Sequence, residues 1–190
     1  MDSREAIMQA ATSLINEKGE RIDEITVREI CKRANVGLGL VNYHFGNKDK
    51  LIELCVERMV NGIVEHFCSL QEKTAGMTPF EKLNYLGGMT LDFLFEHYAV
   101  SRISMLSDMS APKDDDNTHR TYLAYLPLVS ACRPDWEEAT LKRKTFCLIA
   151  AMQQLLLRHK IFLKLYGIDL TKSEERKAVH EQMLHDILGV

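Results

Sequence analysis

The chain has 190 residues and a net charge of −3 at pH 7, with 46% hydrophobic and 27% charged residues. This balance is typical of a soluble globular protein with a sizeable core, and the net charge argues against a protein that coats nucleic acid without selectivity. No apolar run approaches the roughly 18 residues that a membrane span needs. The acidic start and the five scattered cysteines lead us to expect a cytoplasmic protein without a signal peptide or a disulfide framework.

The first predicted helix covers residues 3–18. Asp2 is placed to cap it, Glu5 stands at the capping-box position, and Gly19 ends it. We expect this helix to brace the two short helices that follow it by covering the backs of both. Its apolar side chains form one continuous stripe, made of Ala6, Ile7, Ala10, Ala11, Leu14 and Ile15.

The segment from Thr26 to Leu51 predicts a helix-turn-helix. Thr26 and Glu29 have the spacing of a capping box at the start of one short helix, and Asn35 tolerates the left-handed conformation that ends such a helix. A second helix of about two turns is expected at residues 38–45. Together with residues 3–18, these two helices would form a three-helix head.

The rest of the chain predicts six further helices and no strand, because no segment alternates with period two. The fold class is therefore all-α, with about nine helices, and the domain boundary is expected between a head at residues 1–47 and a larger helical domain at residues 48–190. The six further helices are expected at residues 47–71, 78–98, 99–110, 118–131, 133–166 and 171–188.

Two adjacent glycines, Gly87 and Gly88, lie in the middle of the helix predicted at residues 78–98. Each is about 0.8–1.0 kcal/mol less favourable there than alanine. Either a second helix crosses close to them or they leave room for a ligand, and we favour close packing. The acidic segment at residues 111–117 is interpreted as a solvated linker, because one acidic run supplies no fixed geometry for a metal. We expect neither a metal site nor a cofactor.

The head carries a series of residues at characteristic spacing, and the most specific part is Tyr43-His44-Phe45 followed by Lys48 and Leu51. With these residues, the first fifty or so positions resemble the DNA-binding head of the TetR family of bacterial transcriptional regulators. Beyond about residue 55 the resemblance is one of architecture. The other residues that carry it are Ala10, Ala11, Leu14, Gly19, Thr26 to Ile30, Ala34 to Val36, and Gly39.

The resemblance implies that residues 1–47 bind DNA and that residues 48–190 bind a small effector and dimerise through the last two helices. The chain departs from the family pattern at three positions. Gly37 stands where serine is usual, Leu40 where threonine is common, and Asn42 where tyrosine is frequent. These departures concern the phosphate contacts and the operator sequence, and they leave the fold unaffected.

Recognition of double-stranded DNA would rest on a few side chains, because residues 1–60 hold nine Lys and Arg against ten Asp and Glu. Asn42 can pair with adenine in the major groove, and Leu38 and Leu40 can contact thymine methyl groups. Lys48 lies at the first turn of a helix, where its ammonium and the free N–H groups would hold one phosphate. The candidate DNA contacts are Thr26, Arg28, Leu38, Leu40, Asn42, Tyr43, His44, Lys48 and Lys50.

A two-turn reading helix gives little specificity alone, so we expect a homodimer that reads a palindrome. The candidate interface residues come from the last two predicted helices. Packing within the subunit is the alternative for some of them. They are Leu155, Leu156, His159, Phe162, Leu163, His180, Met183, Leu184 and Ile187.

A pocket for a largely apolar effector is a second expectation, and it depends on the family resemblance. Methionine and aromatic side chains are abundant between residues 85 and 152, and they are suited to an adaptable apolar wall. A plain core is the alternative for each of them. The candidates are Tyr85, Met89, Phe93, Met105, Met109, Tyr122, Tyr125, Phe146 and Met152.

From these expectations we predict a repressor that a small, largely apolar effector releases from DNA. Two other functions are alternatives to it. A regulator of the same kind could respond to a protein partner and have no small-molecule pocket. An enzyme is a remote alternative, because the sequence has no nucleophile elbow, phosphate-binding loop, dinucleotide motif or zinc motif.

Overall fold

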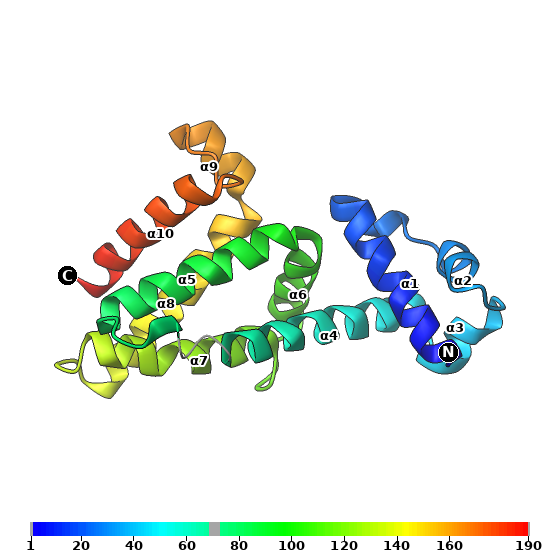
Figure 1. Ribbon diagram of the computed structural model, residues 1–190, viewed down its shortest axis with the longest axis horizontal. Helices are drawn as coiled ribbons and strands as arrows, with labels where there is room; N and C mark the ends of the chain where they lie inside the picture. The colour runs from blue at the N-terminus through cyan, green and yellow to red at the C-terminus, as the bar shows by residue number, and fades with distance from the viewer. Residues whose placement is uncertain (1, 69–72, 190) are drawn as a thin grey trace. The chain divides into compact units, whose positions relative to one another are not determined.

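The structure is a computed structural model that describes residues 2–68 and 73–189, apart from the side chains of residues 20, 23 and 61–68. Throughout those ranges the chain forms helices and no strands (Figure 1), which confirms the predicted all-α class. The helices are α1 (Ser3–Lys18), η1 (Gly19–Glu24), α2 (Val27–Ala34), α3 (Gly39–Phe45), α4 (Lys48–Cys68), α5 (Pro79–Glu96), α6 (Tyr98–Ser110), α7 (Asn117–Cys132), α8 (Glu138–Leu157), α9 (His159–Tyr166) and α10 (Ser173–Leu188).

The chain forms two compact units. The head unit comprises Met1–His66 and His97–Ser104, and the C-terminal unit comprises Phe67–Glu96 and Met105–Val190. The head unit extends past the boundary predicted at residue 47, because α4 contributes Leu51, Ile52, Cys55 and Val56 to the head core. The functional division at that boundary stays a prediction.

The start and end signals read from the head sequence are present in the structure. The Asp2 carboxylate accepts the Arg4 N–H at 3.2 Å, and Gly19 leaves α1 with φ of 56°. Thr26 and Glu29 form the complete capping box of α2, and Asn35 ends that helix in the left-handed conformation. The predicted stripe of α1 faces the head core, where Ile7, Ala11 and Ile15 have no exposed surface. Local chemistry therefore fixes where the head helices begin and end.

The prediction of a single long helix at residues 133–166 is wrong, because the helix begins later than predicted and is then divided in two. Residues 133–137 form a turn in which Trp136 N–H donates to the Arg133 carbonyl at 3.2 Å, and α8 begins only at Glu138. A bend of 83° then separates α8 from α9. At the bend His159 Nδ1 lies 2.9 Å from the Leu156 carbonyl oxygen, and beyond it Phe162 packs against the C-terminal core.

The described ranges thus hold ten α-helices, compared with the nine helices expected. None of these helices is by itself long and apolar enough to cross a membrane, although α8 and α9 have the length and composition as a bent pair.

In the C-terminal unit, α5, α7, α8 and α10 surround a core that includes Leu83, Leu91, Leu148 and Leu184. The predicted close packing at the paired glycines is confirmed. A Cβ atom on Gly87 would lie 2.2 Å from Nε2 of His180 on α10, and His180 has no exposed surface. The glycine therefore allows α5 and α10 to approach each other at this point.

Candidate nucleic-acid interface

Helix α3 is held by two side chains that face the head core. Val41 is fully buried and Phe45 is 6% exposed. On the other side of the helix-turn-helix, the Cys31 thiol lies under the turn, 3.7 Å from the Gly37 carbonyl oxygen. The reading helix is thus fixed from inside the head, and its outer side chains are left for contacts with another molecule.

The outer side of α3 presents apolar and polar side chains to solvent. Leu38 is 55% exposed and Tyr43 is 81% exposed. Asn42 is exposed as well, and so is Arg28 on α2. Leu40 differs from the prediction, because it is half-buried against the head core and has less surface available for a thymine methyl group.

His44 has a partner inside the head. Its Nε2 lies 2.8 Å from Ser3 Oγ, and its ring meets the Tyr43 ring edge-on with centroids 5.0 Å apart. The imidazole therefore links the end of α3 to the start of α1. His44 is a candidate DNA contact, and one of its two ring nitrogens, Nε2, is already engaged within the head.

Thr26 is also engaged, at the start of α2. Its hydroxyl accepts the Glu29 N–H at 3.2 Å, and both its N–H and its hydroxyl donate to the Glu29 carboxylate at 2.9 Å. Lys18 Nζ lies 3.1 Å from the same carboxylate. The hydrogen bonds from Thr26, followed by the one from Lys18, lower the pKa of Glu29 to about 2. The Glu29 carboxylate therefore stays ionised beside Thr26, a candidate DNA contact at the start of α2.

The two candidate lysines of α4 differ in their surroundings. Lys48 is half-buried, and its ammonium donates to the Ile25 carbonyl at 3.1 Å. Lys50 is exposed, and its ammonium lies 2.8 Å from the Glu53 carboxylate, which raises the pKa of Lys50 through that hydrogen bond. The Asn47 side chain accepts the Lys50 N–H at 2.8 Å, as expected of a cap. Lys48 is thus positioned by the head, whereas Lys50 is paired on its own helix.

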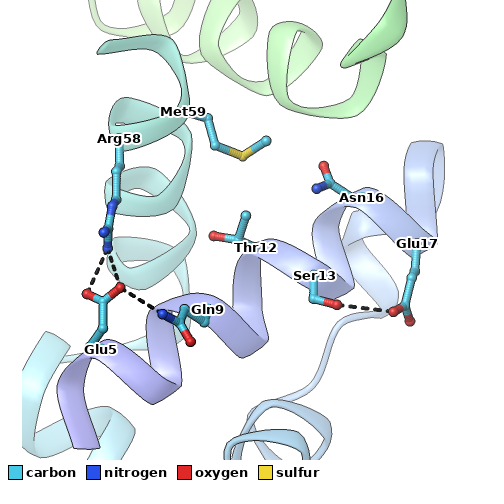
Figure 2. A pocket seen from close by; sticks show the side chains of 8 residues that line it. All are labelled: Glu5, Gln9, Thr12, Ser13, Asn16, Glu17, Arg58 and Met59. Carbon is cyan, nitrogen blue, oxygen red and sulfur yellow. Dashed lines mark hydrogen bonds and ion pairs between the residues drawn. The ribbon is translucent and has the colours of Figure 1, made fainter. Parts of the chain in front are cut away.

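A groove of about 660 Å³, lined mostly by residues with polar side chains, lies elsewhere on the head unit, between α1 and α4, and was not predicted (Figure 2). Arg58 Nη1 donates to both carboxylate oxygens of Glu5 at 2.8 and 2.9 Å, and Gln9 donates to the same carboxylate at 3.2 Å. The Arg58 hydrogen bond lowers the pKa of Glu5. The pattern of α1 alone gave no signal of this groove, because α4 supplies its other wall.

Comparisons with known proteins agree with the geometry of the head. A family model described as "Bacterial regulatory proteins, tetR family" matches residues 7–55, which run from the α1 core to Cys55 of α4. The head of this chain is therefore similar to the DNA-binding head of the TetR family. The resemblance expected from the Tyr43 to Leu51 run is confirmed.

Two solved structures are similar to this chain in fold over nearly its whole length. One is a TetR-like transcriptional regulator from Rhodococcus sp. RHA1, with a TM-score of 0.62, 15% identity, and coverage of 99% of this chain and 97% of that one. A second comes from work on the molecular basis for control of antibiotic production by bacterial hormones, with a TM-score of 0.62, 16% identity, and coverage of 97% and 96%. At these identities the likeness concerns the fold alone. The comparison with curated proteins gave no match.

Some of the candidate effector residues lie in the interior of the structure, and others lie on its surface. Tyr125, Met105 and Met152 are buried, and the Tyr125 hydroxyl lies 2.6 Å from Thr90 Oγ1. Burial raises the pKa of Tyr125 far above its usual value. Phe146 and Met109 are 64% and 49% exposed. The half-buried candidates are Tyr85, Met89, Phe93 and Tyr122.

The candidate dimer residues also divide into buried and exposed side chains. Leu156, His180 and Leu184 have no exposed surface and Leu155 has 8%, so these four pack within the subunit. His159, Phe162, Met183 and Ile187 are half-buried, and Leu163 is 45% exposed. The sequence reasoning missed three exposed neighbours of Leu163 on α9, because it placed them in one continuous helix. They are Ile161, Leu165 and Tyr166.

Proposed function

We propose that this chain is a TetR-family repressor that binds a palindromic operator as a homodimer and is released by a small, largely apolar effector. The observation that carries the DNA-reading part is the outer side of α3, where Leu38, Asn42 and Tyr43 are exposed above a buried Val41 and Phe45. An α-helix with such a side fits the major groove, where base edges present a distinct pattern of donors, acceptors and methyl groups.

The exposed side chains have different roles in this proposal. Asn42 can donate to N7 and accept from N6 of adenine, and Leu38 can contact a thymine methyl group. Tyr43 and Arg28 are placed to reach phosphate oxygens, which position the head without reading sequence. Thr26, His44 and Leu40 support the surface from within the head, since their polar atoms or side chains are engaged there.

The experiment that tests this function is selection of binding sites from random duplex DNA by the full-length chain and by Asn42→Ala. We expect the wild type to enrich one site. The variant should lose preference at one base pair of each half-site, at a cost of about 1–3 kcal/mol for the wild-type site. Arg28→Ala is the matched control and should weaken binding without changing the enriched sequence. A wild type that enriches no sequence would exclude the proposed function.

Salt titration separates the two lysines of α4. Lys48→Ala should weaken binding to every sequence and reduce the slope of log K against log salt by about one unit, because its ammonium keeps two N–H groups for a phosphate. Lys50→Ala should change the slope less, since Glu53 already offsets the charge of Lys50. Fluorescence anisotropy between 50 and 200 mM salt measures both slopes. Equal slopes for wild type and Lys48→Ala would show that Lys48 acts only through the Ile25 carbonyl.

The homodimer is proposed because one short reading helix covers too few base pairs for specificity. The surface that supports it in the C-terminal unit is the apolar part of α9, where Ile161, Leu163 and Leu165 are exposed. Half-buried Met183 and Ile187 on α10 extend the set. The effector part of the proposal rests on the family and on half-buried side chains such as Tyr85 and Met89, which a ligand could displace.

A further inference from the structure

The groove between α1 and α4 takes no part in the proposed DNA contacts, and its size is that of a small-molecule site. Its volume is about 660 Å³, within the roughly 300–1,000 Å³ range of such sites. Six of its lining residues come from α1 and two from α4 (Figure 2). Met59 is the one apolar residue among these eight. The groove is therefore suited to a polar ligand, unlike the apolar effector proposed above.

Hydrogen-bond acceptors recur at every turn along the α1 wall of the groove. Glu5, Gln9, Ser13 and Glu17 all line it and are four residues apart in sequence. Successive members of this row are roughly 6 Å apart along the helix axis, and the two carboxylates at its ends are roughly 18 Å apart, at 1.5 Å per residue. A ligand that follows the row is elongated and donates hydrogen bonds at a regular interval.

The two end carboxylates are charged and have room for a ligand. A hydrogen bond from Arg58 lowers the pKa of Glu5, and one from Arg33 lowers the pKa of Glu17. The side chain of Glu5 is 33% exposed and that of Glu17 is 56% exposed. Arg33 and Ser13 both donate to one oxygen of Glu17, Oε1, although a carboxylate can accept about four hydrogen bonds. Each end of the groove therefore attracts a cation.

The rest of the groove favours an aliphatic cation over an anion. Arg58, the one cationic residue of the lining, already donates to both oxygens of Glu5 at 2.8 and 2.9 Å. Thr12 of α1 and Met59 of α4 lie between the two carboxylates, and both are half-buried (Figure 2). A methyl group and a thioether make good contacts with methylene groups.

We propose that this groove binds a linear aliphatic polyamine, whose end ammonium groups pair with Glu5 and Glu17 while its methylene groups cover the apolar atoms between them. Three or four methylene groups separate successive nitrogens in such a molecule, and an extended spacer of this length matches the interval between the acceptors on α1. The inner N–H groups donate to the two middle acceptors of the row. The inference goes beyond the proposed function, since none of these residues belongs to the DNA-reading side of α3.

Isothermal titration calorimetry of the full-length chain with spermine, at about 150 mM salt, tests this assignment. DNA is left out, because its phosphates bind polyamines as counterions. We expect one spermine per chain. Glu17→Gln removes an end carboxylate and should weaken binding about two- to fivefold, whereas Asn16→Asp adds a carboxylate to the same lining and should tighten it by a similar factor. The matched control is Glu57→Gln, an equal change of charge at an exposed position of α4 outside the lining, and it should bind like the wild type.

The controls separate a built site from diffuse attraction to an acidic protein. Equal weakening by Glu17→Gln and Glu57→Gln would overturn the assignment, as would Mg²⁺ or n-butylamine displacing spermine as well as an unlabelled polyamine does. Failure of the wild type to bind spermine would overturn it directly. Thermal unfolding checks that the variants fold, and in Glu17→Gln the Arg33 hydrogen bond to Ser13 at 3.0 Å still joins α2 to α1. All of these results leave the proposed DNA binding untouched, because no step of the assay involves DNA.

Discussion

Replacing Gly87 by alanine is expected to destabilise the C-terminal unit by about 1–3 kcal/mol. The new methyl carbon would lie 2.2 Å from Nε2 and 2.3 Å from Cε1 of His180. The ring has no exposed surface, and its Nδ1 lies 3.0 Å from the Asn84 side-chain oxygen, so it cannot move into solvent. Helix α5 and helix α10 would have to separate, and α10 also carries Met183 and Ile187 of the proposed dimer surface.

The neighbouring glycine provides the control. Gly88→Ala should be neutral or stabilise by up to about 1 kcal/mol, because its Cβ meets only the flexible Lys177 side chain at 3.6 Å. Urea unfolding of the two variants measures the difference. Removing the ring in Gly87→Ala/His180→Ala should recover part of the loss from Gly87→Ala, since the clash is gone. Equal stabilities for the two single variants would contradict the close crossing of α5 and α10.

Acidification from pH 6.5 to pH 5 is expected to cost about 2 kcal/mol of folding stability through His180 alone. Burial lowers the pKa of His180 from 6.5 to about 4. In this window the unfolded chain binds a proton at this residue and the folded chain does not, so stability falls as the pH falls. The ring is held neutral between Asn84 and Gly87, and a charge there would have no acidic partner within the contacts that the structure gives it.

The contribution of His180 is isolated with His180→Gln, which keeps a polar side chain opposite Asn84 and has no proton to gain. The variant can be less stable at pH 7, but its stability should change by about 2 kcal/mol less than that of the wild type over the same interval. Urea titrations at pH 6.5 and pH 5 measure both slopes. Identical pH dependence in the two proteins would show that His180 titrates normally in the folded chain.

The head was predictable because its signals are local. Asp2, Thr26 and Asn35 act on backbone groups within a few residues, so the sequence alone locates the helix ends they produce. Val41 and Phe45 are four residues apart, and this helical spacing likewise indicates that both lie on the inner side of α3. The outer side of α3 was predictable in part, since the helical repeat that turns Val41 and Phe45 inward turns other side chains of α3 outward.

Contacts between distant segments account for what the sequence did not reveal. His44 pairs with Ser3, 41 positions away, and the Lys48 ammonium reaches the Ile25 carbonyl. The periodic spacing of apolar residues in the sequence indicates neither of these contacts. The bend after Leu157 has no glycine or proline to mark it, and beyond the bend Phe162 packs onto the core. Leu156 and Leu184 were predicted at the dimer surface because an apolar stripe on a helix does not indicate whether the same subunit or a second copy covers it.

The central claim is that α3 reads DNA as one of a symmetric pair, and the mass of the DNA complex tests it most directly. Analytical ultracentrifugation of the full-length chain with the selected duplex gives the number of protomers bound per site. We predict two protomers on one site whose half-sites are inverted repeats, centred about 10 base pairs apart or a multiple of that spacing. A single protomer on an asymmetric site, bound with full affinity, would contradict the claim.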